Sequence, residues 1–468
     1  MSSFITKNLP AALVVLVCAL PADPGSAKGL RYERGQSTAS GLTLFEGARL
    51  IVGDGTPSIE NSAFIVQHNR FTRIGRKGDL PAPPGARRIA LTGKTVMPAL
   101  IDAHVHLGYR KGLSFTAANY TRETILDTLD RFAYCGVAAV LEAGTGRGDL
   151  PFQVRSGAHT GARYLTAGQG FAMPNAGPGV PMRDSAFGVT TEAQAREDVR
   201  KLAAQHPDLI KIWVDDRNGT VEKLRPPLYR AIIDEAHAHR IRVMAHIATL
   251  DDAKDLLRAG IDGFGHVVRD RDVDDELLAL LKQRPNVFFV ETLWGERQAI
   301  YQEKPGWIDA PVLHDLLSPE EVMRLAESFS GAASPAQRES ARRLLRNVAA
   351  LNAAGVLLGL GTDTGGVTGG QYFGIASLIE LELMVNAGLT PAQAIVAATR
   401  NSAQILRLEE LGTLAVGKSA DFLVLDANPL DDIANIRRIS SVYSRGGEVN
   451  RAALRTRWGG PVSGKRLQ

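Results

Sequence analysis

The stretch "VMPALIDAHVH", residues 96–106, is an almost continuous apolar run that ends in two histidines two positions apart. A run of this kind is typical of a buried β-strand, in which alternate side chains share one face. His104 and His106 therefore leave the end of the predicted strand on the same side. The same design, an apolar run that closes on a polar side chain, recurs along the chain.

Seven further apolar runs follow, and amphipathic helical stretches such as 226–240 and 250–260 separate them. The runs are "GVAAVLEAG" (136–144), "ARYLTAG" (162–168), "LIKIWVDD" (209–216), "RIRVMAHIA" (240–248), "GIDGFGHVV" (260–268), "NVFFVETLW" (286–294) and "GVLLGLGTD" (355–363). Continuous apolar strands joined by short helices are what a buried parallel sheet requires. Eight strand–helix units predict an α/β fold, a (β/α)8 TIM barrel, with a doubly wound open sheet as the alternative.

The two ends of the chain have a different pattern, with short strands and turn residues. Residues 41–96 contain "LTLFEGARLIV" and "SAFIVQHNRFTRIG", and residues 411–468 contain "GTLAVGKSADFLVLDANPL" and "ISSVYSRGGEVN". We expect the two pieces to join into one small β-sandwich domain, followed by a C-terminal tail. The TIM-barrel domain then occupies residues 97–410.

The first 27 residues differ from the rest: Lys7 precedes an apolar run from Leu9 to Leu20, and small residues lead to Ala27. This order is typical of a cleaved signal peptide, and the run is short for a membrane span. An uncleaved anchor or a disordered tail is the alternative. Cys18 lacks a lipoprotein signal, and only Cys135 remains in the mature chain. We expect an exported protein, periplasmic or secreted, with no stable membrane insertion after cleavage.

The composition excludes some partners. The chain has 468 residues, 44% of them hydrophobic, and a net charge of only +4. The pI near 9.0 comes without a dense basic run interleaved with aromatic residues, so no nucleic-acid partner is expected.

Polar residues mark the ends of five of the predicted strands, where barrel active sites form. Besides His104 and His106, they are Lys211, His246, His266 and Asp363. Each has an ordinary explanation alone, for example a capping role for an aspartate. Together, imidazoles and a carboxylate at one barrel mouth predict a site for divalent metals such as zinc.

With these residues at these positions, the sequence resembles the metal-dependent hydrolases of the amidohydrolase superfamily. "GKTVMPALIDAHVHLG" is similar to its first-strand signature, with Ala99 where glycine is more usual. "GLTPAQAIVAATRNSAQIL" and "GTLAVGKSADFLVLDANPL" are similar to its closing segment. Within the superfamily the chain most resembles the imidazolonepropionase-like, dipeptidase-like and ochratoxinase-like group, and the resemblance covers nearly the whole chain after residue 40.

The resemblance implies a binuclear centre with two divalent ions, zinc expected. His104, His106 and Asp363 would hold one ion, and His246 and His266 the other. Lys211, carboxylated by carbon dioxide to N6-carboxylysine, would bridge them together with a hydroxide. Burial favours the neutral amine that reacts with carbon dioxide, which would explain a lysine inside an apolar strand. Asp363 and Lys211 are thus the expected catalytic residues.

Substrate contacts should come from the loops that follow the strands. The candidates are Tyr109, Trp213, Arg269, Trp294 and Tyr372. Arg269 would bind a carboxylate or pair with Asp270 or Asp272, and the two tryptophans would form an aromatic wall or pack in the core.

Two longer segments lie outside the regular strand–helix pattern. The Gly- and Pro-rich loop 168–188 is expected to act as a lid or a surface connection. The helical stretch 318–354 is expected to cover the mouth or to contact a second subunit in a homo-oligomer.

The leading functional hypothesis is a binuclear hydrolase that cleaves an amide or peptide-like C–N bond of a small molecule. Hydrolysis of another bond on the same site, in a lactone, carbamate or cyclic amide, is the second hypothesis. A catalytically inactive binding or assembly protein is the third, and such proteins typically lose ligands. "WVDDR" and "VVRD", after strands four and six, depart from dipeptidase-like relatives and argue against a simple dipeptide substrate.

Overall fold

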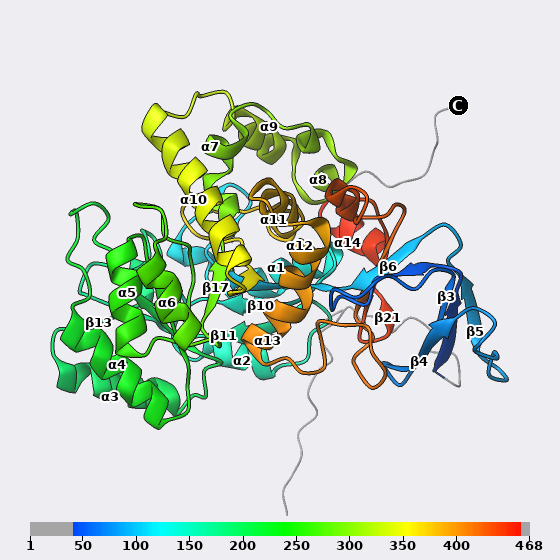
Figure 1. The fold of residues 1–468 in the computed structure, drawn as a ribbon, viewed down its shortest axis with the longest axis horizontal. Helices are drawn as coiled ribbons and strands as arrows, with labels where there is room; N and C mark the ends of the chain where they lie inside the picture. The colour runs from blue at the N-terminus through cyan, green and yellow to red at the C-terminus, as the bar shows by residue number, and fades with distance from the viewer. Residues whose placement is uncertain (1–40, 460–468) are drawn as a thin grey trace, which may run out of the picture. The chain divides into compact units, whose positions relative to one another are not determined.

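The computed structural model describes residues 41–459 (Figure 1). The predicted signal peptide, residues 1–27, and the last residues of the predicted tail, 460–468, lie outside the described residues. Among residues 41–459, no helix combines the length and the apolar character that crossing a membrane requires.

Two sheets are built from both ends of the described chain. The four-stranded sheet has the order β4-β3-β1-β5, and the five-stranded sheet has the order β2-β6-β19-β20-β21. Their strands are β1 (Leu42–Glu46), β2 (Arg49–Leu50), β3 (Ser62–Gln67), β4 (Arg70–Arg76), β5 (Arg87–Ala90), β6 (Thr95–Pro98), β19 (Phe422–Leu425), β20 (Ile439–Ser444) and β21 (Gly447–Glu448). The antiparallel pairing of β6 with β19 joins the two chain ends in one sheet.

An aromatic cluster fills the space between these two sheets. Phe45 and Phe64 stack with ring centroids 4.8 Å apart, and Phe422 meets both rings edge-on at 5.3 Å. Phe71 and Tyr443 complete the cluster, and Tyr443 stacks on Phe422 at 4.5 Å. Because these rings come from β1, β3, β4, β19 and β20, neither chain end could bury its apolar face alone.

Parallel strands form the centre of the fold. They are β7 (Leu100–Val105), β10 (Val137–Glu142), β11 (Arg163–Thr166), β12 (Phe171–Ala172), β14 (Ile210–Trp213), β15 (Val243–His246), β16 (Gly263–Phe264), β17 (Phe288–Glu291) and β18 (Leu357–Leu360). One sheet has the order β11-β10-β7, and a second runs from β12 through β14, β15, β16 and β17 to β18.

Hydrogen bonds connect the two parallel sheets at both of their edges. His106 N donates to Thr364 O at 2.7 Å, beside a parallel bridge between Val105 and Thr364. At the other edge Asp208 N donates to Thr166 O at 3.0 Å. The eight predicted apolar runs therefore follow one another in space in their order along the chain.

The third predicted run, 162–168, contains β11 and ends before β12, the short strand that pairs with β14. β11 pairs with β10, and the chain resumes pairing only in β12, which lies beside β14. Gly168 and Gly170 separate the two pieces, and a Cβ at Gly170 would lie 2.3 Å from the ring of Trp213. The close approach of this ring to the backbone accompanies the break.

Helices alternate with the parallel strands, as the sequence predicts. They include α1 (Arg122–Tyr134), α2 (Leu150–Ser156), α3 (Glu192–Ala203), α4 (Pro226–Ala238), α5 (Leu250–Ala259), α6 (Asp275–Gln283), α11 (Ile375–Asn386), α12 (Pro391–Val396) and α13 (Ser402–Leu406). Side chains of Thr121, Thr191, Thr249 and Asp274 cap four of them by accepting a backbone N–H. A last helix, α14 (Arg451–Arg457), follows β21.

An inserted group of helices separates β17 from β18. Its main members are α7 (Arg297–Tyr301), α8 (Pro311–Leu316), α9 (Pro319–Glu327) and α10 (Pro335–Ala353), drawn yellow-green and yellow in Figure 1. Ser318 and Ser334 start α9 and α10 with capping boxes. Asn347 of α10 donates to the carbonyls of Val268 and Arg271, so this helix is tied to the segment that follows β16.

Candidate metal centre

The six predicted metal ligands come from the carboxyl ends of five parallel strands. His104 is in β7 and His106 directly follows it, Lys211 is in β14, and His246 is the last residue of β15. His266 and Asp363 lie just after β16 and β18. All six are buried or nearly so. Because the carboxyl ends of parallel strands meet at one edge, residues up to 259 positions apart in sequence become neighbours.

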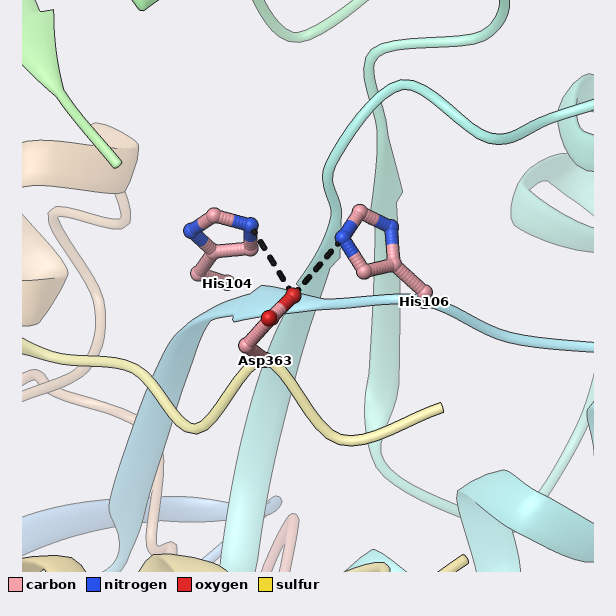
Figure 2. A group of neighbouring side chains, drawn as sticks. All are labelled: His104, His106 and Asp363. Carbon is pink, nitrogen blue, oxygen red and sulfur yellow. Dashed lines mark ion pairs between the residues drawn. The ribbon is translucent and has the colours of Figure 1, made fainter. Parts of the chain in front are cut away.

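His104, His106 and Asp363 converge most closely (Figure 2). Asp363 Oδ1 lies 2.9 Å from His106 Nε2 and 3.6 Å from His104 Nε2. One ligand atom from each lies within 4.8 Å of the others, a spacing that one divalent ion can bridge. Asp363 has a left-handed backbone, φ +54°, which aspartate tolerates better than most residues, and its N–H donates to His104 O.

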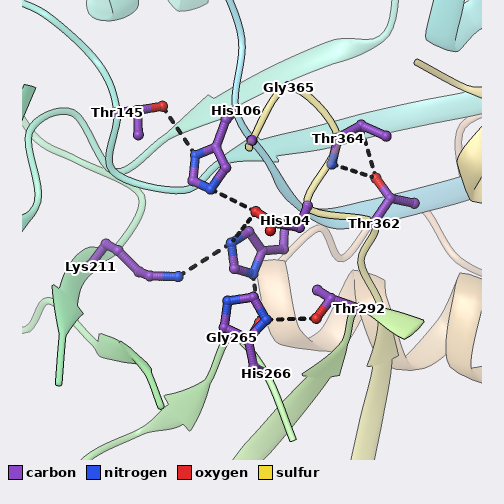
Figure 3. Close-up of polar contacts among 12 residues, drawn as sticks. His104, His106, Thr145, Lys211, Gly265, His266, Thr292, Thr362, Thr364 and Gly365 are labelled. Atoms are coloured by element: carbon purple, nitrogen blue, oxygen red, sulfur yellow. Dashed lines mark hydrogen bonds and ion pairs between the residues drawn. The ribbon is translucent and has the colours of Figure 1, made fainter. Parts of the chain in front are cut away.

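Lys211 and His266 lie next to this group (Figure 3), and His246 packs against His266. Lys211 Nζ is 3.3 Å from His104 Nε2. The ring of His266 is centred 4.9 Å from that of His104 and 4.3 Å from that of His246. Gly265 makes this packing possible, since a Cβ there would lie 2.7 Å from Lys211 Nζ.

Each of the four histidines has one ring nitrogen engaged by the protein. His104 Nδ1 donates to Gly265 O at 2.8 Å. His106 Nδ1 is 3.1 Å from Thr145 Oγ1, whose hydroxyl donates to buried Glu142, so Nδ1 is the donor. The remaining pairs are His266 Nδ1 with Thr292 Oγ1 at 2.6 Å and His246 Nε2 with Asp215 Oδ2 at 3.1 Å. The second nitrogens of His104 and His106 face Lys211 Nζ and Asp363 Oδ1, the atoms of other proposed ligands, and those of His246 and His266 have no hydrogen bond within residues 41–459.

Burial and neighbouring charges set the charge state of the centre. Burial lowers the pKa of Lys211 to about 7, so its amine is readily neutral. Burial also tends to raise the pKa of Asp363, but the hydrogen bond from His106 and the nearby positive charges outweigh it, and the pKa falls below its ordinary value. Burial lowers the pKa of His104, His246 and His266, so the site combines a carboxylate, three imidazoles that are readily neutral and a nucleophilic amine.

The sequence reasoning missed several residues that support the ligands. Glu142 accepts from Thr145 N and Oγ1 at 2.6 Å each and from Thr166 Oγ1 at 3.0 Å. Glu142 is fully buried in β10, and an acidic residue inside "GVAAVLEAG" was the available signal. Thr145 and Thr292 carry no such signal, because threonine is common at strand ends.

Arg269 has a partner that the sequence reasoning did not consider. Its Nη1 lies 3.5 Å from Glu296 Oε1 rather than beside Asp270 or Asp272. Asp270 instead accepts from Leu250 N, and Asp272 pairs with Arg346. Neighbours in sequence are already engaged by other elements, so the expected local ion pair is wrong.

The aromatic candidates are mostly enclosed. Tyr109 is fully buried and donates to Thr145 O at 2.8 Å. Trp294 is also fully buried and donates to Gly369 O, so it packs in the core, one of the two arrangements expected for it. Tyr372 is buried edge-on against Trp294. Trp213 lies nearest the centre, with its ring 5.7 Å from Lys211 Nζ. Their roles toward a substrate stay predictions.

The loop 168–188 contacts the same tryptophan. It carries β12 and β13 (Phe187–Gly188), and Gly177 lies against the Trp213 ring. Arg217, after β14, donates to Gly177 O. The loop is thus packed on the segment that follows Lys211 and is more than a surface connection.

Parallel strands with histidines and an aspartate at their carboxyl ends form a site suited to a divalent metal ion. Comparison with known proteins agrees: the model of the amidohydrolase family matches residues 95–449. The chain belongs to this family, whose members generally use divalent metals and act on small molecules. His104, His106 and Asp363 are the group within the described residues that fits one such ion.

Individual relatives are distant. Ochratoxinase of Aspergillus niger is 25% identical over 439 residues, which cover 84% of this chain and 82% of that protein. The crystal structure of a putative prolidase from Bifidobacterium longum is 26% identical with a TM-score of 0.67, covering 89% and 99% of the two chains. Phenylurea hydrolase B, 21% identical, shows the same fold with a TM-score of 0.69, covering 89% of this chain and 98% of that chain.

Proposed function

We propose that this protein is an exported, binuclear metal-dependent amidohydrolase that cleaves an amide or peptide-like C–N bond of a small molecule. Its parallel strands form one closed (β/α)8 barrel, and the two sheets from the chain ends form a β-sandwich beside it. The hydrogen bonds at both edges of the parallel sheets support the closed barrel. Membership of the amidohydrolase family supports a C–N bond as the target.

The observation that carries the proposal is the buried amine of Lys211 beside His104. A fully buried ammonium would be costly, and the structure gives Lys211 no carboxylate within ion-pair distance among the described residues. A neutral amine adds to carbon dioxide, forming an N–C bond and releasing one proton. The carbamate so formed is an anion with two oxygens, suited to lie between two cations.

Two divalent ions, zinc expected, would fit this donor set: His104, His106 and Asp363 for one, His246 and His266 for the other. When bound, they would supply an acidified water and polarise the scissile carbonyl. Asp363 takes the proton of the attacking water and delivers it to the leaving nitrogen. The ring-nitrogen partners described above hold the histidines in one orientation throughout.

Export rests on the N-terminal sequence, which lies outside the described residues. An inactive binding protein is disfavoured, because all six ligand positions are filled by competent side chains among residues 41–459. A small-molecule substrate is consistent with the family.

Metal analysis and a substrate screen test the proposal together. Purified protein should hold about two divalent ions per chain and release an amine from N-acyl amino acids, peptides, anilides or ureas. Turnover of lactones or esters alone would contradict the amidase assignment.

In Lys211→Met, the carbamate signal seen by ¹³C NMR with labelled bicarbonate should disappear. The variant should also bind one ion fewer or none, and it should lose turnover. Lys254→Met removes a lysine that is also mostly buried but pairs with Asp274 and Glu276 away from the site. It should leave all three readouts unchanged.

A further inference from the structure

We propose that Asp215 is a positioning residue that fixes the orientation and tautomer of His246 and thereby strengthens one of the two metal positions. This inference rests on the proposed binuclear centre. Asp215 lies two residues beyond β14, in the stretch "LIKIWVDD" that also contains Lys211.

The two carboxylate oxygens of Asp215 contact two different donors. Oδ2 lies 3.1 Å from His246 Nε2, and Oδ1 accepts from the backbone N–H of Arg217 at 2.9 Å. The backbone contact holds the carboxylate in place independently of the histidine. An ionised carboxylate can only accept, so Nε2 of His246 carries the proton and Nδ1 keeps its lone pair.

The same geometry excludes Asp215 as a ligand of the ion that His246 would hold. Both carboxylate oxygens are engaged, one of them at Nε2. Because the lone pair of Nδ1 leaves the ring in a different direction from the Nε2–H bond, a metal on Nδ1 would lie away from Asp215. Asp215 therefore acts through His246.

His246 is the histidine whose ring lies at hydrogen-bond distance from a carboxylate outside the proposed ligand set, since the carboxylate beside His106 Nε2 is that of Asp363, itself a proposed ligand. His104 donates to a carbonyl, and His106 and His266 contact threonine hydroxyls. A carboxylate bonded directly to the imidazole raises its basicity, and loss of such a partner typically weakens metal affinity by about 10–100-fold. We therefore expect the metal on the His246 side to depend on Asp215 and the metal on the His106 side to be independent of it.

Stepwise cobalt titration of metal-free protein tests the inference, with chelator competition and visible absorption as readouts. Asp215→Asn should weaken one of the two cobalt-binding steps by about 10–100-fold and change only the absorption that appears with that step. Asp216→Asn is the matched control: it removes the neighbouring carboxylate, which makes no side-chain hydrogen bond within the described residues 41–459, and both steps should match the wild type.

Two outcomes separate the inference from the proposed function. Wild-type protein that binds fewer than two ions contradicts the binuclear centre itself. Wild-type protein that binds two, with Asp215→Asn unchanged, contradicts the role of Asp215 alone. If Asp215→Asn does not fold, Asp215→Ser with added formate replaces it: recovery of the weakened step by formate supports the inference, and no recovery contradicts it.

Discussion

Asp363 combines a constrained backbone with a side chain held between two histidines. Its left-handed φ of +54° follows β18, and its N–H is bonded to His104 O. Oδ1 faces the Nε2 atoms of both His104 and His106. A carboxylate so placed can hold a cation and accept a proton from a molecule beside it.

Asp363→Asn should lower kcat/KM for the amide substrate by about 10²–10⁴-fold, because the amide cannot accept the water proton. The amide oxygen can still serve as a weak ligand, so part of the metal should stay bound. Steady-state kinetics and metal analysis on the same sample check this. A near-wild-type kcat would contradict the proton-transfer role.

Glu291 is a second residue with an unusual environment, outside the metal centre. It is fully buried at the end of β17, and neither carboxyl oxygen has a hydrogen-bond partner among residues 41–459. Burial raises its pKa from 4.5 to about 8, so the folded protein keeps it neutral near pH 7. The residue therefore lowers stability wherever the unfolded chain ionises it.

Glu291→Met should raise the free energy of unfolding, and the gain should grow with pH. A raised folded-state pKa means that the contribution of Glu291 is fully present below about 4.5 and is lost as the pH rises through about 8. Urea unfolding between pH 4.5 and 8.5 measures the difference. Glu409→Gln, at an exposed position, should show no such trend. A pH-independent difference for Glu291→Met would show that the carboxyl is not held neutral.

Among the elements, the glycine-rich loop 365–370 is held by its carbonyl groups. Arg110 donates to the carbonyls of Gly365, Gly366 and Val367. Arg297 donates to Thr368 O, and Trp294 donates to Gly369 O. Because a Cβ at Gly366 would lie 3.0 Å from Asp363 Oδ1, the position of this loop limits the position of the Asp363 carboxylate.

Arg110→Met should speed hydrogen exchange of the loop amides and lower kcat/KM by about 10-fold or more, since small misplacements of reacting groups are costly. The ligands themselves are intact, so metal content should not change. Arg122→Met, which removes only a long hydrogen bond to Gln153 O, is the control. Unchanged exchange in Arg110→Met would mean that the other donors suffice to hold the loop.

At the scale of the whole molecule, one ion pair connects the five-stranded sheet to the parallel strands. Arg163, at the start of β11, donates to both oxygens of Asp421 at 2.8 and 3.1 Å. Only 1% of the Asp421 side chain and 15% of the Arg163 side chain are exposed. Burial alone would raise the pKa of Asp421, but the contacts with Arg163 and Ser419 outweigh it, so the pKa lies below its ordinary value.

Asp421→Asn should lower the free energy of unfolding by up to about 3–5 kcal/mol, because it removes the buried charge partner of Arg163 and leaves the more exposed Glu410, whose Oε1 lies 3.6 Å from Arg163 Nε. A depressed folded-state pKa means that this stability is present above about pH 4 and is lost as the pH falls below it. Urea unfolding at neutral and acid pH checks both statements.

Asp426→Asn breaks the exposed pair with Lys94 and should cost at most about 1 kcal/mol. Equal losses in Asp421→Asn and Asp426→Asn would contradict the importance of the buried connection.

The pattern of residues along the chain was sufficient for the order of strands and helices and for the six candidate ligands. The spacing of apolar residues and the local composition can be read from a short stretch, such as "VMPALIDAHVH" or "VMAH", without knowing the rest of the chain. Lys211 could be singled out for the same reason, because a charged residue inside an apolar strand is anomalous in the sequence alone.

The partners of these residues came from folding. Asp215 with His246, Thr145 with His106, Glu296 with Arg269 and the orphaned Glu291 all depend on which strand ends and loops meet. A hydrogen bond joins two atoms about 3 Å apart, whereas the residues in these pairs lie dozens of positions apart in the sequence. Spacing along a chain carries no direct information about such distances, so the sequence could name the candidate ligands but not the contacts that orient them.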